Sequence, residues 1–140
     1  MRAITLIETV VTLGVVSATI GMIAGFIKYH QPSITLNRAA GDVRATLNEA
    51  RNLSLTSQTN HGVLFDVANE SFYLMQNGNV LASTTLPTYV EFGLVGPFTN
   101  DTAIFNSAGA AAETGTVILQ NTSGDTKSIT INPSGFVTVQ

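Results

Sequence analysis

The residues from 9 to 27 carry no charged side chain, and this stretch constrains the fold more than any other. As a helix with a rise of about 1.5 Å per residue it spans about 28 Å, close to the thickness of a bilayer's hydrocarbon core. Glu8 lies at its leading edge, Arg2 precedes it and Lys28 follows it. The stretch therefore predicts a membrane-spanning helix, and the rest of the chain is expected to form a separate domain.

Two general explanations of this stretch compete. A cleaved secretory signal peptide fits poorly, because the run is longer than a signal peptide's apolar region and the polar residues 28–31 follow it in place of a small-residue cleavage site. An ordinary single-pass anchor remains open. In such an anchor Glu8 would extend toward the headgroups and favour the positive helix N-terminus, because a carboxylate within the apolar core costs about 2.5–3.5 kcal/mol at the helix centre.

A third explanation comes from the residues before the span, Ala3-Ile4-Thr5-Leu6-Ile7-Glu8. They resemble the N-terminus of type IV pilins and pseudopilins, in which a leader ends in a small residue and an apolar residue begins the mature chain. The resemblance implies that a prepilin peptidase cuts between Ala3 and Ile4 and that Ile4 is then methylated. It also implies that Glu8 pairs with the Ile4 amine of a neighbouring subunit in a filament.

Small residues recur every four positions within the span, at Ser17, Gly21 and Gly25. Such a face lets two helices approach closely, although glycine is also common in membrane helices for other reasons, and both interpretations stay open. Many pilins have a proline in mid-span. Here the first proline is Pro32, which lacks a backbone donor, so a kink is expected over residues 28–32.

After Pro32 the apolar residues recur at steps of three and four, which predicts one helix from about residue 4 to about residue 57. Its second half is expected to pack on a sheet. Residues 42–52 resemble the matching helix of H-type minor pseudopilins and FimT-like minor pilins. The predicted buried stripe consists of Leu36, Ala40, Val43, Leu47, Ala50 and Ser54.

Short runs typical of β-strands follow, and Asn77-Gly78 between two of them is a strong hairpin signal. Strands are expected at 62–67, 72–76, 80–83, 89–94, 103–106, 116–120, 128–132 and 136–139, with loops at 93–102 and 107–115. The predicted core of the last three strands is Val117, Leu119, Ile129, Ile131, Phe136 and Val139.

The C-terminal part again resembles the H-type pseudopilin and FimT-like domain. The expected fold class is therefore α+β and pilin-like, with a long N-terminal α-helix followed by a small antiparallel β domain. The expected division is a leader at residues 1–3, a hydrophobic transmembrane and assembly helix at 4–31, and an amphipathic helix with a β-sheet domain at 32–140.

The sequence offers no support for catalysis, a cofactor or a metal site. It has no cysteine, no phosphate-binding loop and no hydrolase or zinc motif. His30 and His61 are expected at the surface, and Asp66 with Glu70 is expected to mark a charged hairpin end. Only Arg38, Arg44, Arg51 and Lys127 follow Pro32 as basic residues, and the net charge is −3, so nucleic acid is not an expected partner.

The sequence thus predicts a structural subunit of a type IV pilus-like or type II secretion pseudopilus filament. Its expected partners are copies of itself or other pilins, a prepilin peptidase, an inner-membrane assembly platform and, before assembly, the membrane. The chain is expected to be single-pass in the cytoplasmic membrane with its N-terminus inside, and then in an extracellular or periplasmic filament. The alternatives are a minor tip subunit that binds or primes, and a single-pass protein that forms no filament.

Overall fold

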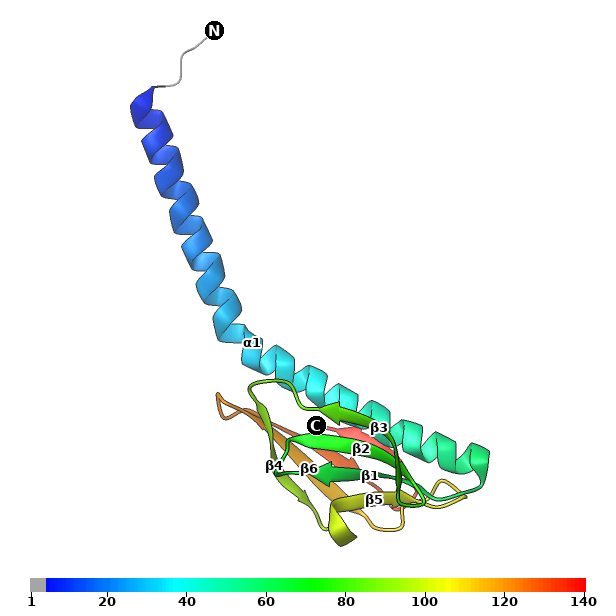
Figure 1. Cartoon of the computed structure of the whole chain (residues 1–140). Helices are drawn as coiled ribbons and strands as arrows, with labels where there is room; N and C mark the ends of the chain where they lie inside the picture. Colours follow the sequence, from blue (N-terminus) through cyan, green and yellow to red (C-terminus); the bar gives the residue numbers. More distant parts are fainter. Residues whose placement is uncertain (1–4) are drawn as a thin grey trace. The chain divides into compact units, whose positions relative to one another are not determined.

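The computed structural model describes the backbone of residues 5–140 and the side chains of residues 5–23 and 31–140. The chain divides into two compact units, one ending at Gln31 and the other beginning at Pro32, and each is described by itself. One helix, α1 (Leu6–Ser57), runs through both (Figure 1). The predicted helix and its C-terminal end are therefore confirmed, and its first residue in the structure is Leu6.

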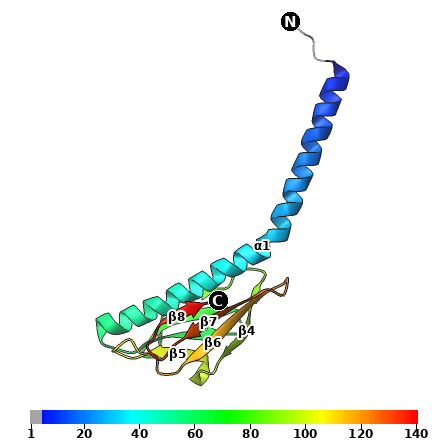
Figure 2. The same cartoon turned by 180° about the vertical axis from the view of Figure 1, so that it is seen from behind.

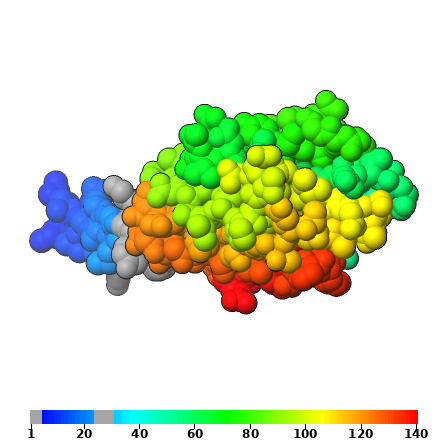
Figure 3. All heavy atoms as spheres, turned by 90° about the horizontal axis from the view of Figure 1, so that it is seen from below, coloured from blue at the N-terminus to red at the C-terminus, as the bar shows by residue number. Residues whose placement is uncertain are grey.

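The second unit holds eight strands in two antiparallel sheets. Sheet A has the order β3-β2-β1-β5, and sheet B has the order β4-β6-β7-β8. In Figure 3 residues of β2 and β3 from sheet A are green and lie at the top of the view, and residues of β7 and β8 from sheet B are orange to red and lie below them. The strands are β1 (His61–Asp66), β2 (Ser71–Gln76), β3 (Asn79–Thr85), β4 (Val90–Gly96), β5 (Thr102–Phe105), β6 (Gly115–Asn121), β7 (Thr126–Ile131) and β8 (Val137–Val139), with a short 3-10 turn, η1 (Thr99–Asp101), before β5.

The predicted Asn77-Gly78 hairpin joins β2 to β3. Both turn residues have positive φ, 49° at Asn77 and 86° at Gly78, which is the conformation of a two-residue turn that matches the twist of its strands. Asparagine and glycine tolerate this backbone better than other residues do. The local sequence therefore fixes the register of the hairpin.

The second half of α1 lies along the sheets, as Figures 1 and 2 both show. Its predicted stripe is confirmed, because all six stripe residues are at most 2% exposed. They share one core with the inner faces of both sheets, where the Phe65 ring of sheet A meets the Phe92 ring of sheet B edge to face at 5.8 Å between centroids. The helix and the two sheets thus bury a common set of side chains.

Strands β4 and β8 differ in detail from the sequence-based expectation. Residues 93–96 were expected in a loop but continue β4, with Gly93 as an extra residue between the paired Phe92 and Leu94. This bulge breaks the alternation by which a strand is recognised. Phe136 was expected in the core but is 60% exposed. Strand β8 begins one residue later, at Val137, and the Val137 side chain is buried in its place. Val139 is only half-buried.

The helix-to-sheet contact predicts a contrast between two truncations in α1. Leu47→Ala is expected to lower the free energy of unfolding of the second unit by about 2–5 kcal/mol, because Leu47 is fully buried. Ile34→Ala, at a side chain that is 67% exposed, is expected to change it by less than about 0.5 kcal/mol. Chemical unfolding of the detergent-solubilised chain, followed by circular dichroism, measures both. Equal losses in the two variants would contradict this packing.

Candidate assembly surface

The first part of α1, described with its side chains up to residue 23, is an apolar helix. Its segment Leu6–Ile23 is long and apolar enough to cross a membrane. Every described side chain from residue 5 to residue 23 is exposed, including Leu6, Val11 and Ile20. A surface of this kind is stable in lipid or against other apolar helices, and not in water.

The threonine hydroxyl groups inside this segment are bonded to the helix itself. Thr12 Oγ1 donates to the Glu8 carbonyl at 2.6 Å, and Thr19 Oγ1 donates to the Val15 carbonyl at 2.6 Å. Polar groups must find such internal partners where no water is present. The threonines therefore do not disqualify the segment as a membrane helix.

Glu8 belongs to a helix cap as well as to the predicted assembly pair. The Glu8 backbone N–H lies 3.3 Å from Thr5 Oγ1 and 3.1 Å from the Thr5 carbonyl, so Thr5 caps the helix. The spacing Thr5-x-x-Glu8 is that of a capping box, a signal in the sequence that could have identified Thr5. Ala3 and Ile4 lie outside the described residues, and the pairing of Glu8 with the Ile4 amine stays a prediction.

The small-residue face is open along its described part. A Cβ atom added to Gly21 would meet nothing within 4 Å, and the same holds for Gly14, which lies three residues before Ser17 on this face. The side-chain surroundings of Gly25 are outside the described residues. Pro32 lies within α1 and is half-buried. Close helix packing on this face and a kink at Pro32 both stay predictions.

The turn between β6 and β7 holds the start of the second half of α1. Ser33 Oγ donates to an Asp125 carboxylate oxygen at 2.8 Å, and Asn121 Nδ2 donates to the same oxygen at 2.9 Å. The Asn121 side chain is buried, and its Oδ1 accepts the backbone N–H groups of Ser123 and Asp125. The Asn121 and Ser33 bonds hold the pKa of Asp125 below its ordinary value of 3.8.

The other end of α1 is held by two loops. Arg51 Nε donates to the Gly109 carbonyl at 3.0 Å, and its guanidinium lies over the Phe136 ring, 4.7 Å from the centroid. Buried Ser54 donates to the Ala50 carbonyl at 2.7 Å. Gly135 must stay small, because an added Cβ would overlap the Gly109 carbonyl oxygen. The helix is thus fixed to the β domain at both ends of its buried stripe.

Other candidate residues have structural partners. His61 was expected at the surface but is 3% exposed, because it shares the inward side of β1 with Val63; its Nδ1 lies 3.1 Å from the Thr59 carbonyl. The side chain of His30 lies outside the described residues. No group of three or more possible metal ligands occurs among the described residues.

The two acids of the first hairpin serve separate turns. Asp66 accepts hydrogen bonds from the side chain and backbone of Asn69, which lower its pKa. Glu70 accepts the Phe92 backbone N–H at 2.8 Å and so joins sheet A to sheet B. They do not form an acid pair for catalysis.

Comparison with known proteins places the fold. No family model and no curated protein matches the chain. The minor pseudopilin EpsH of the Vibrio cholerae type 2 secretion system superposes with a TM-score of 0.60 at 17% identity, over 75% of this chain and 95% of EpsH. The type IV minor pilin FimU of Pseudomonas aeruginosa superposes with a TM-score of 0.61 at 14% identity, over 82% of this chain and 92% of FimU.

The chain therefore has the α+β fold of pilins and pseudopilins, as its sequence predicted. The EpsH structure is described as a minor pseudopilin, and the FimU structure as a type IV minor pilin.

The bond between Ser33 and Asp125 predicts a pH-dependent contribution to stability. The folded-state pKa of Asp125 lies below 3.8, so its contribution is present above about pH 3.8 and is lost as the pH falls through the folded value. Asp125→Asn is therefore expected to lower the Tm near neutral pH and to lower it progressively less at more acid pH. Thermal unfolding of both proteins across this range measures the difference.

Asp101→Asn is the matched control, because the exposed Asp101 carboxylate has no hydrogen-bond partner among the described side chains. Its difference from the native chain is expected to be small. A difference for Asp125→Asn that is constant across the pH range would contradict the role of the carboxylate.

Proposed function

We propose that this chain is a structural subunit of a type IV pilus-like or type II secretion pseudopilus filament. The observation that carries the proposal is the single helix α1, whose first part is apolar and exposed while its second part is built into a domain with the pilin-like fold. A helix of this kind exchanges lipid for other apolar helices without refolding, because its backbone bonds are internal. No bond-making chemistry is required of the β domain.

Processing and assembly follow from the N-terminal residues. In the proposed mechanism a prepilin peptidase cuts between Ala3 and Ile4, and an inner-membrane platform extracts the subunit from the membrane. Glu8 then pairs with the Ile4 amine of a neighbour, which satisfies two charges that would be costly in an apolar surrounding. Close packing through Ser17, Gly21 and Gly25 completes the contact between helices.

The proposed location changes with assembly. Before assembly the chain is single-pass in the cytoplasmic membrane, with its N-terminus inside and its β domain outside. After assembly it is part of an extracellular or periplasmic filament made of copies of itself or of other pilins. Support for the first stage is the apolar segment Leu6–Ile23.

The proposed pairing predicts that Glu8→Gln abolishes assembly but not membrane insertion. The Thr5 cap accepts the backbone N–H of residue 8, which glutamine keeps, so the substitution removes the charge and leaves the helix start intact. The filament fraction sheared from cells is expected to lose the variant, while the membrane fraction retains it. Immunoblots of the two fractions measure this.

Glu49→Gln is the matched control, since Glu49 is an exposed acid on the second half of α1. It is expected to assemble as the native chain does. Filaments of undiminished number in Glu8→Gln would refute the charge pairing.

The proposed processing predicts the intact mass of the chain purified from cell membranes. The mass is expected to lack Met1, Arg2 and Ala3 and to include one added methyl group on Ile4. Intact-protein mass spectrometry with N-terminal fragmentation measures both changes. A chain that keeps its first three residues would instead be a single-pass protein without a filament.

A second candidate function is a minor tip subunit that primes assembly or binds cargo, a surface or DNA. The observation that favours a minor role is that both EpsH and FimU are described as minor subunits. Within this candidate, DNA is the weakest ligand, because Arg51 is already bonded to Gly109 and Phe136. Counting the subunits per filament separates a minor from a major component.

A further inference from the structure

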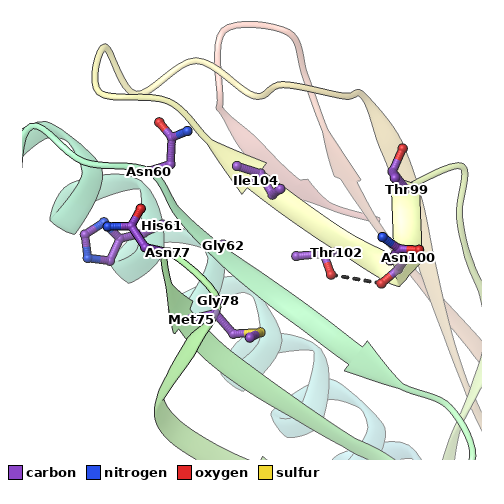
Figure 4. Close-up of a pocket in the computed structure, with 10 residues that line it drawn as sticks. All are labelled: Asn60, His61, Gly62, Met75, Asn77, Gly78, Thr99, Asn100, Thr102 and Ile104. Carbon is purple, nitrogen blue, oxygen red and sulfur yellow. Dashed lines mark hydrogen bonds between the residues drawn. The ribbon is translucent and has the colours of Figure 1, made fainter.

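The outward face of sheet A has a trough that the assembly role does not use. It is a cavity of about 350 Å³, of the size of small-ligand sites. Across its middle Met75 of β2, Gly62 of β1 and Ile104 of β5 are direct partners in the sheet. Figure 4 shows this row, with Met75 and Ile104 on the two sides of the β1 ribbon.

Gly62 is the reason that the row is hollow. It contributes no side chain between its two apolar neighbours, and its own backbone is buried. A larger residue is also excluded there, because an added Cβ would lie 2.8 Å from the Ala103 carbonyl oxygen and 3.3 Å from Ile104 Cγ1. The absence of a side chain at Gly62 therefore explains both the close approach of β1 to β5 and the hollow above it.

Neutral polar groups stand at both ends of the trough. Asn60 and Asn77 lie together at one end, and Asn100 and Thr102 lie at the other (Figure 4). Thr102 Oγ1 donates to the Asn100 carbonyl at 2.9 Å and fixes that end. The three asparagine amides have no hydrogen-bond partner among the described residues, and each amide offers donors and an acceptor.

The chemistry of the trough selects a class of ligand. Its lining has no acid, lysine or arginine. The one imidazole there, that of His61, is 3% exposed and has its Nδ1 3.1 Å from the Thr59 carbonyl, so the trough offers an ion little to pair with. Both edges of β1 are already paired, with β2 and with β5, so an extended peptide cannot add to it as a strand. The remaining pattern is an apolar floor between two sets of amides and hydroxyls.

We propose that this trough binds a neutral carbohydrate of one or two sugar rings. The C–H face of a sugar ring would lie on Met75 and Ile104, while its hydroxyl groups would bond to the amides at both ends. Each hydroxyl both donates and accepts, as an amide side chain does. The proposal goes beyond the filament role, and it uses no residue of α1.

The test measures binding by the full chain before assembly. The chain is purified in a detergent without a sugar headgroup, and maltose, cellobiose, lactose and chitobiose are titrated separately by saturation-transfer NMR. At least one is expected to bind. A sulfated disaccharide is expected to bind more weakly than the neutral ones, because no lysine or arginine lines the trough to pair with sulfate. Binding to none of the four neutral sugars would overturn the proposal.

Two variants locate the bound sugar. Asn77→Gly and Asn100→Gly each remove one amide and keep the positive φ of 49° and 53° that these positions require. Each is expected to weaken binding by roughly 3- to 10-fold, the effect of one lost hydrogen bond. Asn37→Ala, at an exposed asparagine on α1, is the control and is expected to bind as the native chain does. Unchanged affinity in both trough variants, with the melting temperature retained, would overturn the site.

The trough could instead be covered by another subunit. A photo-crosslinking residue placed at Ile104 tests this in filaments, and a crosslink to a second pilin without sugar binding would refute the carbohydrate proposal. Because sugar binding is measured on the unassembled chain, its failure does not bear on the filament proposal. Failure of Glu8→Gln to block assembly likewise leaves the sugar result unaffected.

Discussion

The burial of one stripe of α1 against both sheets is the contact on which the second unit depends. Each sheet has a single inner face, and the helix covers both at once through side chains such as Leu47 and Val43, which are fully buried. Alanines at 39, 40 and 50 let the helix approach the sheets closely. The hydrogen bonds at Ser33 and Arg51 fix where the stripe begins and ends. Removing this contact would expose two apolar sheet faces together.

The first part of the same helix is apolar on its exposed surface, whereas the second part buries its apolar side chains against the sheets. In the first part the hydroxyls of Thr12 and Thr19 are bonded to the helix backbone. Such a surface has little to gain from water and can pass from lipid to other helices. Glu8 fits both environments, because its backbone N–H is capped by Thr5 and its charge favours the positive helix N-terminus whether or not it has found a partner.

Much of this architecture could be predicted from the sequence because its signals are periodic and local. The stripe from Leu36 to Ser54 and the Asn77-Gly78 turn are set by neighbours in the chain, and the structure has both. The errors arise where tertiary context decides. A bulge at Gly93 breaks the alternation of β4, which hid the end of that strand. His61 was expected at the surface, but it lies two residues before Val63 in β1, and alternate residues of a strand point to the same side. The trough was not foreseen, since Gly62, Met75 and Ile104 meet only through the pairing of three strands.

Charged residues make up 11% of the chain, and several of the acids are used inside the domain. Glu70 joins the two sheets, Asp125 holds the helix, and Glu113 accepts two hydrogen bonds from Thr99 beside the trough. None of these three acids lines the trough, so recognition there does not use their charge. The outer face of sheet A therefore relies on shape and on neutral amides for recognition. This separates the two proposed roles physically: assembly depends on apolar surface and one carboxylate in α1, whereas recognition on sheet A depends on hydrogen bonds that salt does not screen.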